Sequence, residues 1–185
     1  GEFFCAGADH EVVAGDDDER MKELLNTYSA AFQWMMHEPI PVVVGARGPA
    51  AGAGASLISY AADLRVIAPE TEIWWPEIEM GVPAMRPMAQ LTPEIGYPKT
   101  LELMLLGEKL SAREAKELGL VNRVVPADEV DETVREVAGQ LATYGEEFGV
   151  NGDVLEIGQR IREAAHGSTT VYSSYQTSKT LYGGR

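Results

Sequence analysis

The sequence is poor in cysteine, positive charge and long apolar runs, and each shortage excludes a class of protein. Cys5 is the only cysteine among the 185 residues, so no internal disulfide can form and we expect a cytoplasmic protein. No apolar run approaches the roughly 20 residues of a membrane-spanning helix. The 15 lysine and arginine residues face 29 aspartate and glutamate residues, a net charge of −14. Because nucleic-acid binding needs a basic face, we expect neither a nucleic-acid partner nor a membrane.

Signatures of nucleotide, metal and serine-hydrolase sites are also missing. The Gly/Ala run 47–56 is not followed by Gly-Lys-Ser/Thr, and Leu57 stands where a dinucleotide fingerprint needs its third glycine. The sequence has three histidines: His10, His37 and His166. None of them has metal-ligand spacing, and none lies near Ser56 to make it a nucleophile. We expect no metal and no separate cofactor.

The sequence does have alternating strand-like and helical segments. Stretches of β-branched and aromatic residues predict strands over 42–44, 63–68, 72–75 and 120–125. Apolar spacing and capping residues predict helices over 16–37, 98–106, 111–119, 128–144 and 154–165. Residues 80–87 and 145–152 are predicted as loops, and the Ser/Thr/Tyr-rich tail from Gly167 is unassigned. Strands that alternate with helices indicate an α/β domain.

The first of these helices carries a stripe of methionine and aromatic side chains. Its members share helical spacing: Met21, Leu24, Leu25, Tyr28, Phe32, Met35 and Met36. Such a stripe is more typical of a core-facing helix than of a cofactor site. We therefore expect it to lie in the core.

The Gly/Ala run lies between a predicted strand and a predicted helix, so it reads as a tight turn that opens directly into that helix. A turn almost without side chains lets a ligand approach its backbone. The free N–H groups of a helix N-terminus bind an anion, or a carbonyl oxygen that becomes one. Close packing of small residues is the other interpretation of the run.

The predicted strand 72–75 carries two tryptophans and is followed by Pro76 and then Glu77. A carboxyl group half-buried beside aromatic walls has a raised pKa, which suits it to acid/base work. The alternative is that Glu77 is an ordinary solvated carboxylate in a loop, an interpretation that also fits Glu79. Backbone donors together with one such carboxylate are typical of proton transfer beside a carbonyl group.

Four segments resemble the crotonase (enoyl-CoA hydratase/isomerase) superfamily, in that family's order. Phe4-Cys5-Ala6-Gly7-Ala8-Asp9 resembles its first oxyanion segment, and Gly48–Val66 resembles its second. Trp75-Pro76-Glu77-Ile78 with Gly81-Val82-Pro83 is similar to its catalytic stretch. Leu101–Pro126 is similar to its downstream signature.

The resemblance implies a spiral of ββα units followed by a helical C-terminal region. On this basis residues 1–126 form the α/β core and 127–185 the helical region. The sequence begins at Gly1, without a methionine, in what looks like the middle of a strand just before the first resembling segment. We therefore expect the family's N-terminal strands to be missing and the chain to be a fragment. The resemblance also implies acyl-CoA substrates, with coenzyme A carried as part of the substrate, and a homotrimer or a dimer of trimers.

The resemblance also implies which residues form the site. The N–H groups of Ala8 and Ala53 would hold the thioester oxygen, and Glu77 would be the acid/base. The residues that would contact substrate are Ala6, Gly7, Asp9, Gly52, Gly54, Ser56, Trp75, Pro76 and Val82.

Ser56 determines the predicted subtype. Hydratases of this family carry one glutamate at this position and a second after the proline, but here only Glu77 remains. A single base can move a proton from one carbon to another, so the sequence favours a Δ3–Δ2 enoyl-CoA isomerase reaction over hydration. The stretch 84–91 also departs from the Gly-rich sequence of the family. The alternative is an acyl-CoA-binding subunit without turnover.

Overall fold

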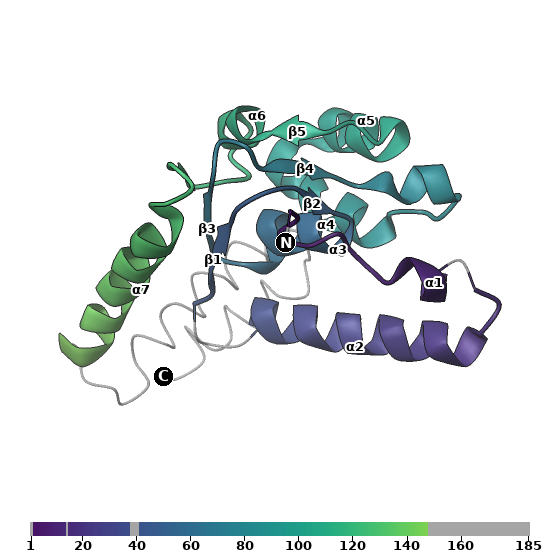
Figure 1. The fold of residues 1–185 in the computed structure, drawn as a ribbon, viewed down its shortest axis with the longest axis horizontal. Helices are drawn as coiled ribbons and strands as arrows, with labels where there is room; N and C mark the ends of the chain where they lie inside the picture. The colour runs from purple at the N-terminus through teal and green to yellow at the C-terminus, as the bar shows by residue number, and fades with distance from the viewer. Residues whose placement is uncertain (1, 14, 38–40, 148–185) are drawn as a thin grey trace, which may run out of the picture. The chain divides into compact units, whose positions relative to one another are not determined.

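The computed structural model describes residues 2–13, 15–37 and 41–147 of the chain (Figure 1). The strands are β1 (Val43–Ala46), β2 (Ala50–Ala51), β3 (Leu64–Ile67), β4 (Glu72–Trp74), β5 (Leu110–Ser111) and β6 (Arg123–Val124). The α-helices are α1 (His10–Val13), α2 (Asp18–His37), α3 (Ala53–Ser56), α4 (Met85–Ile95), α5 (Tyr97–Leu106), α6 (Ala112–Glu117) and α7 (Val130–Glu147). A π-helical turn, η1 (Leu57–Ala61), continues α3, and η2 (Pro76–Met80) is a 3-10 helix. The predicted helix 154–165 and the tail lie outside the described residues.

The strands form two small sheets. One has the order β1-β3-β6 with all neighbours parallel, and Val43 pairs with Leu64. In the other, β2 runs parallel to β4 and β4 runs antiparallel to β5. Cys5 adds a parallel bridge to Ala50 at the free side of β2. The predicted α/β class is confirmed, and the small sheets bring three separate chain segments side by side.

The chain divides into two compact units. Gly1–Met36 and Val42–Ala138 form one of them, and His37–Pro41 with Gly139–Arg185 form the other. All the residues of the candidate site belong to the first unit. The predicted boundary after residue 126 stays a prediction.

Most of the predicted elements are present, but the predictions for residues 80–87 and for the Gly/Ala turn were wrong. The loop predicted over 80–87 is helical from Met85, because the ring of Pro87 is tolerated in the first turn of a helix. The Gly/Ala turn does not open directly into a helix either. The short strand β2 comes first, and Gly52 then turns the chain with a φ of 52°.

The stripe along α2 is only partly in the core. Phe32 is buried, and Tyr28, Met35 and Met36 pack against the core from partly exposed positions. Leu25, nearer the start of the helix, is 52% exposed. The prediction that the whole stripe lies in the core was therefore wrong for the first half of α2.

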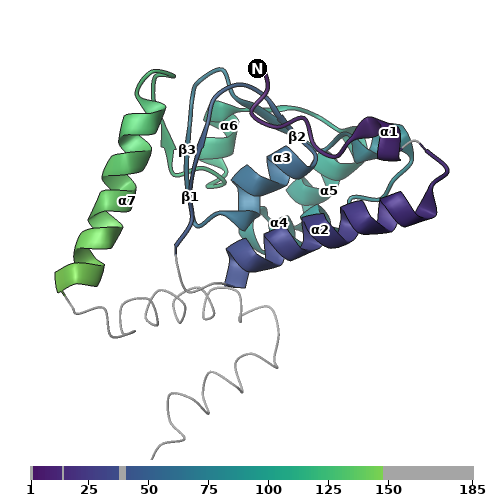
Figure 2. The same cartoon turned by 60° about the horizontal axis from the view of Figure 1, so that its bottom comes forward.

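The main core lies between the β2-β4-β5 sheet and the helices around it. Its largest fully buried side chains are Trp75, Ile58, Ile67, Ile73, Leu91, Leu103 and Leu120. In both views α2 lies alongside α3 and α4 (Figures 1 and 2). The Gly/Ala run ends at Ser56 and continues into η1. Phe32 of α2 packs against Tyr60 of η1 with ring centroids 5.9 Å apart, so α2 covers one side of this buried segment.

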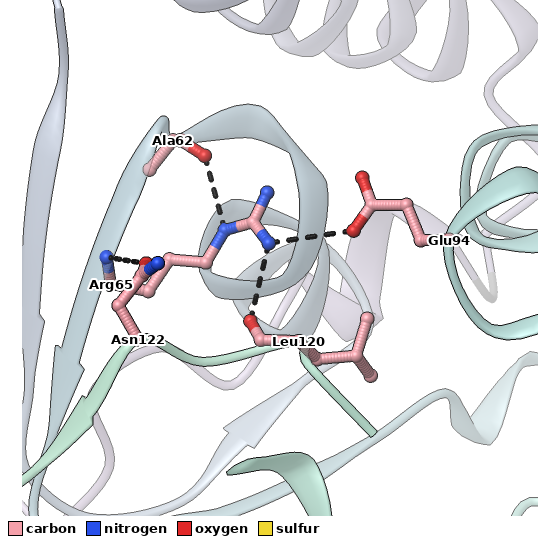
Figure 3. Close-up of polar contacts among 5 residues, drawn as sticks. All are labelled: Ala62, Arg65, Glu94, Leu120 and Asn122. Carbon is pink, nitrogen blue, oxygen red and sulfur yellow. Dashed lines mark hydrogen bonds and ion pairs between the residues drawn. The ribbon is translucent and has the colours of Figure 1, made fainter. Parts of the chain in front are cut away.

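Arg65 ties three segments to strand β3 (Figure 3). Its Nε donates to the carbonyl oxygen of Ala62 at 3.1 Å and its Nη1 to that of Leu120 at 3.3 Å. The same Nη1 lies 3.5 Å from Oε2 of Glu94 on α4. Asn122 completes the contact by accepting from the Arg65 N–H at 2.8 Å. One guanidinium group therefore holds together the end of η1, α4 and the segment before β6.

We predict that Arg65→Met lowers the free energy of unfolding by about 2–4 kcal/mol. The substitution keeps the aliphatic stem but leaves two carbonyl groups and a carboxylate without their donor. Urea unfolding followed by circular dichroism measures the change. Glu94→Gln is the control, because it retains an acceptor oxygen and removes only a partly solvated charge, so its loss should be about 1 kcal/mol or less. A fully stable Arg65→Met protein would contradict this role.

Candidate functional site

Two backbone segments meet at the centre of the candidate site. Residues 4–8 run beside residues 49–53: Phe4 N–H donates to the Pro49 carbonyl at 2.9 Å, and Ala51 N–H donates to the Cys5 carbonyl at 3.0 Å. On its other side, Gly52 N–H donates to the Trp74 carbonyl of β4 at 3.0 Å. The Gly/Ala run is therefore held between the N-terminal segment and β4.

Glycine is required where these segments are closest. Gly7 has a φ of 96°, and a Cβ there would lie 3.1 Å from the Ala51 carbonyl oxygen and 3.6 Å from the Ala53 nitrogen. A Cβ on Gly54 would lie 2.7 Å from the Cβ of Cys5. Gly54 is buried, so its missing side chain permits contact between the two segments.

Two backbone amides beside this contact are left without a backbone acceptor. Within the described part of the chain, no backbone carbonyl accepts from the N–H of Ala8 or of Ala53. Ala53 is the first residue of α3, where the helix itself offers its N–H no acceptor. Gly7, directly before Ala8, is the residue whose added Cβ would approach the Ala53 nitrogen. The segment that carries Ala8 therefore runs close to the Ala53 nitrogen, and neither N–H donates to a backbone carbonyl group of the described residues.

Glu77 reaches the same place from the second residue of η2. A Cβ on Gly52 would lie 3.3 Å from Oε1 of Glu77 and 4.0 Å from the Cα of Gly7. The structure therefore brings Gly7, Gly52 and the Glu77 carboxyl group together. Gly52, with its φ of 52°, leaves the space that this carboxyl group approaches.

The Glu77 carboxyl group is half-buried, and one of its oxygens lacks a partner. Burial raises the pKa of Glu77, while a hydrogen bond from its own backbone N–H opposes the change. Its Oε2 is fully buried and has no hydrogen-bond partner. A raised pKa favours the protonated form of a carboxyl group and suits it to acid/base work. Glu79, two residues on, is exposed.

Ser56 is buried, and a buried tryptophan holds its hydroxyl group. The Nε1–H of Trp75 donates to Ser56 Oγ at 3.1 Å, and both residues are fully buried. Among the described residues, no hydrogen bond joins Ser56 to a histidine, and His166 lies outside them. The absence of a serine nucleophile stays a prediction.

The other predicted substrate contacts lie at the edges of this arrangement. Ala6 and Asp9 are exposed, and the Asp9 carboxylate accepts from the Glu11 N–H at 2.9 Å at the start of α1. Pro76 begins η2, and Val82 is 40% exposed directly after it, with its N–H donating to the Glu77 carbonyl at 2.9 Å. Val82 therefore helps to fix the backbone that presents Glu77.

The sequence analysis did not identify two phenols near Ser56. Tyr60 lies one helical turn after Ser56 and is 2% exposed, and its hydroxyl group has no partner of hydrogen-bond geometry. Tyr28, from α2, lies close enough for its pKa to respond to Ser56, Tyr60 and Glu77, although burial is what raises it most. The i, i+4 spacing of Ser56 and Tyr60 is the one sequence signal that could have suggested part of this cluster.

Neither metal nor membrane chemistry is suggested by the residues that the structure describes. No group of three or more histidine, cysteine, aspartate or glutamate side chains there is placed to hold a metal ion. None of the helices in that part of the chain is long and apolar enough to cross a membrane.

The same sequence features place the chain in a family. Residues 1–148 match the family described as enoyl-CoA hydratase/isomerase. The chain is 32% identical over 143 residues to "Enoyl-CoA isomerase/hydratase fer4" of Mycosarcoma maydis, which covers 76% of this chain and 52% of that protein. It is 31% identical over 149 residues to a "Putative enoyl-CoA hydratase" of Thermus thermophilus. That alignment covers 77% of this chain and 57% of the Thermus protein. The chain therefore belongs to the enoyl-CoA hydratase/isomerase (crotonase) family.

The fold supports the same assignment. The crystal structure of an enoyl-CoA hydratase from Bacillus anthracis superposes with a TM-score of 0.76 at 29% identity. The superposition covers 100% of this chain and 69% of that protein. The chain spans about half the length of the curated relatives that it matches.

The buried carboxyl group predicts a pH-dependent gain in stability for Glu77→Gln. Because the pKa of Glu77 is raised in the folded protein, the native state binds more protons than the unfolded state above pH 4.5. The ionised carboxylate therefore destabilises the fold increasingly as the pH rises through that window, and the substitution by glutamine removes this penalty. We expect the stability of the variant relative to wild type to be greater at pH 8 than at pH 5 in urea unfolding.

Glu79→Gln is the matched control for the charge itself. It removes one negative charge from the same 3-10 helix, but at an exposed side chain. Its effect on stability should be small at both pH values. An equal effect of Glu77→Gln at pH 5 and pH 8 would show that burial does not shift this carboxyl group.

Proposed function

We propose that the chain transfers a proton beside the carbonyl group of an acyl-CoA thioester, with Glu77 as the acid/base. The observation that supports this most directly is the carboxyl group of Glu77, half-buried against Gly52, with one oxygen that has no partner. A base held in that state needs little reorganisation when it takes a proton. Membership of the enoyl-CoA hydratase/isomerase family favours an acyl-CoA substrate.

The N–H groups of Ala8 and Ala53 form the proposed oxyanion hole. The thioester oxygen would accept from both, and the charge that develops on it in the enolate would strengthen both hydrogen bonds. Each donor of this kind is worth roughly 3–4 kcal/mol of transition-state stabilisation. Both positions use only the backbone, which is consistent with alanine at each. Of the remaining predicted contacts, the exposed Ala6, Asp9 and Val82 would line the path of the substrate, whereas Ser56 and Trp75 are fully buried behind it.

The favoured reaction is the Δ3–Δ2 isomerisation of an enoyl-CoA. The Glu77 carboxylate would take a proton from C2 of a 3-enoyl-CoA, and the electron pair would delocalise into a dienolate held by the two amides. The protonated Glu77 would then return the proton to C4, which leaves the double bond between C2 and C3. No second carboxylate is needed, which fits the fixed serine at position 56.

A binding protein without turnover is the second candidate. It is favoured by Ser56, whose hydroxyl group is taken up by Trp75 where a second carboxylate would assist hydration. Such a protein would bind acyl-CoA through the same amides without moving a proton.

We predict that Glu77→Gln lowers the rate of 3-hexenoyl-CoA isomerisation by about 10²–10⁴-fold, the contribution of a placed acid/base. The rate is followed by the absorbance of the conjugated thioester. Binding of hexanoyl-CoA, measured by calorimetry, should persist, because glutamine has nearly the same size and the amides are unchanged.

The control Glu79→Gln should retain the wild-type rate, since its side chain is exposed on the same helix. Unchanged turnover by Glu77→Gln would overturn the role of Glu77. Binding of hexanoyl-CoA without turnover by the wild-type protein would support the second candidate instead.

Self-association into trimers is proposed as well. Exposed apolar side chains at the end of α5 and on η2 support it, and they include Leu105 at 56%, Leu106 at 61% and Ile78 at 43%. The α5 end and η2 are neighbours, because a Cβ on Gly107 would lie 3.4 Å from Cγ2 of Ile78.

We predict that sedimentation equilibrium gives a mass of three or six chains and that Leu106→Asp lowers it. A charge placed in an apolar interface would be desolvated without a partner. The control Leu25→Asp changes an equally exposed leucine on α2 and should leave the mass unchanged. A monomeric wild-type protein would contradict the proposed trimer.

A further inference from the structure

Arg86 differs from the other partly buried cations of the described residues because it has no carboxylate partner. Three cations there are partly buried: Arg65, Arg86 and Lys99. Arg65 pairs with Glu94 at 3.5 Å, and Lys99 pairs with Glu102 at 2.5 Å. No carboxylate oxygen of the described residues lies within 4.0 Å of the Arg86 guanidinium group. In a chain with a net charge of −14, a partly desolvated and unpaired cation calls for an explanation.

The guanidinium group of Arg86 lies between α4 and α2. Arg86 is the second residue of α4, and its Nη2 donates to Ser29 Oγ on α2 at 3.2 Å. Its Cζ lies 5.9 Å from the centroid of the Tyr28 ring. Both contacts are to neutral groups, so they leave the positive charge uncompensated and most of the five N–H donors free.

Tyr28 connects Arg86 to the proposed acid/base. The Glu77 carboxylate raises the pKa of the Tyr28 phenol, and the Arg86 guanidinium group lowers it. The phenol therefore lies within electrostatic range of both groups. The pKa of Glu77, in contrast, is set by burial and by its own backbone, so Arg86 is not its ion-pair partner. The Glu77 carboxylate and the Arg86 guanidinium group thus both act on the Tyr28 phenol.

Hydroxyl groups border the same region. The Tyr28 ring packs against Phe32 with centroids 4.3 Å apart, and Phe32 packs against Tyr60 with centroids 5.9 Å apart. Among the described residues, the Tyr60 hydroxyl group and Oε2 of Glu77 are buried without a partner of hydrogen-bond geometry, although the hydroxyl groups of Ser56 and Tyr28 lie near that of Tyr60. A purely hydrocarbon acyl chain would leave the Glu77 oxygen unsatisfied at a cost in binding. An oxygen-bearing acyl group would not.

We propose that the substrate is an acyl-CoA whose acyl group carries a carboxylate beyond the reacting carbons, bound by the guanidinium group of Arg86 and the hydroxyl group of Tyr28. This rests on the proposed function, because it takes Glu77 to mark the reacting carbons. Arg86 supplies charge-assisted donors that suit a carboxylate. The neutral phenol of Tyr28 supplies one further donor. The bound carboxylate would in turn neutralise the one partly buried cation that has no carboxylate of its own in the described chain.

A matched pair of substrates tests the proposal. Hex-3-enedioyl-CoA and hex-3-enoyl-CoA have the same length and double bond, and differ only in a terminal carboxylate or methyl group. The expected ratio of kcat/KM in the wild-type protein favours the dioyl substrate by about tenfold or more, the weight of one hydrogen bond to a charged group. Arg86→Gln should reduce this ratio by about tenfold or more, with little change for the hexenoyl substrate.

Three further variants separate recognition from structure. Arg86→Lys retains the charge and should restore part of the preference, and Tyr28→Phe should lower it less than Arg86→Gln. Arg113→Gln removes a cation that is exposed on α6 and should leave the ratio unchanged. A merely structural tie from Arg86 to Ser29 would instead change both substrates equally, and that result would overturn the proposal.

A binding measurement keeps the test independent of turnover. Hexanedioyl-CoA and hexanoyl-CoA cannot isomerise, and calorimetry compares their affinities for the wild-type protein and for Arg86→Gln. A preference for hexanedioyl-CoA that disappears in Arg86→Gln supports the carboxylate site. If the protein shows this preference but turns over neither hex-3-enedioyl-CoA nor hex-3-enoyl-CoA, only the proposed reaction fails. Equal affinities, or tighter binding of hexanoyl-CoA, would overturn the carboxylate site.

Discussion

The close approach of two backbone segments, residues 4–8 and 49–54, is the constraint on which the rest of the site depends. Side chains at Gly7 or Gly54 would push the segments apart, since an added Cβ would lie 3.1 Å from the Ala51 oxygen or 2.7 Å from the Cβ of Cys5. The approach brings Gly7, directly before Ala8, close to the nitrogen of Ala53. It also leaves next to Gly52 the space that the Glu77 carboxyl group approaches.

The proposed site also depends on buried polar atoms whose hydrogen-bonding capacity is not fully used. Burial of Glu77, Tyr28 and Tyr60 raises the pKa of each, and Oε2 of Glu77 and the Tyr60 hydroxyl group have no partner. Folding alone would favour pairing or removing such groups. Their presence around one carboxyl group is what a site for a polar ligand requires, and it fits a substrate whose oxygens complete their hydrogen bonds. Trp75 fixes Ser56 in this interior, and Glu77 is the proposed acid/base.

The sequence predicted those parts of the fold that have strong local signals. The strands near 43–46, 64–67 and 72–74 follow from β-branched and aromatic residues. The helix predicted over 111–119 is present as α6, and Ser111 caps it together with Glu114. The sequence did not predict β2, because two alanines carry no strand signal and pair only with distant segments. It did not predict the start of α4 either, because its prolines suggested a loop.

The residues of the candidate site likewise differ in whether the sequence could predict them. Gly7, Gly52 and Glu77 lie in motifs that the sequence displays, and the structure brings them together. Tyr28 and Arg86 meet only because α2 and α4 pack side by side, which no spacing along the chain reveals. Leu25 shows the converse, since its helical spacing suggested a core position and the structure leaves it exposed.

Exchange of the C2 protons of hexanoyl-CoA with deuterated solvent, followed by nuclear magnetic resonance, tests the central claim most directly. It reports whether Glu77 forms an enolate at the oxyanion hole, without any later step. The account predicts measurable exchange by the wild-type protein and exchange lower by about 10²–10⁴-fold in Glu77→Gln. Equal exchange by the two proteins would contradict it.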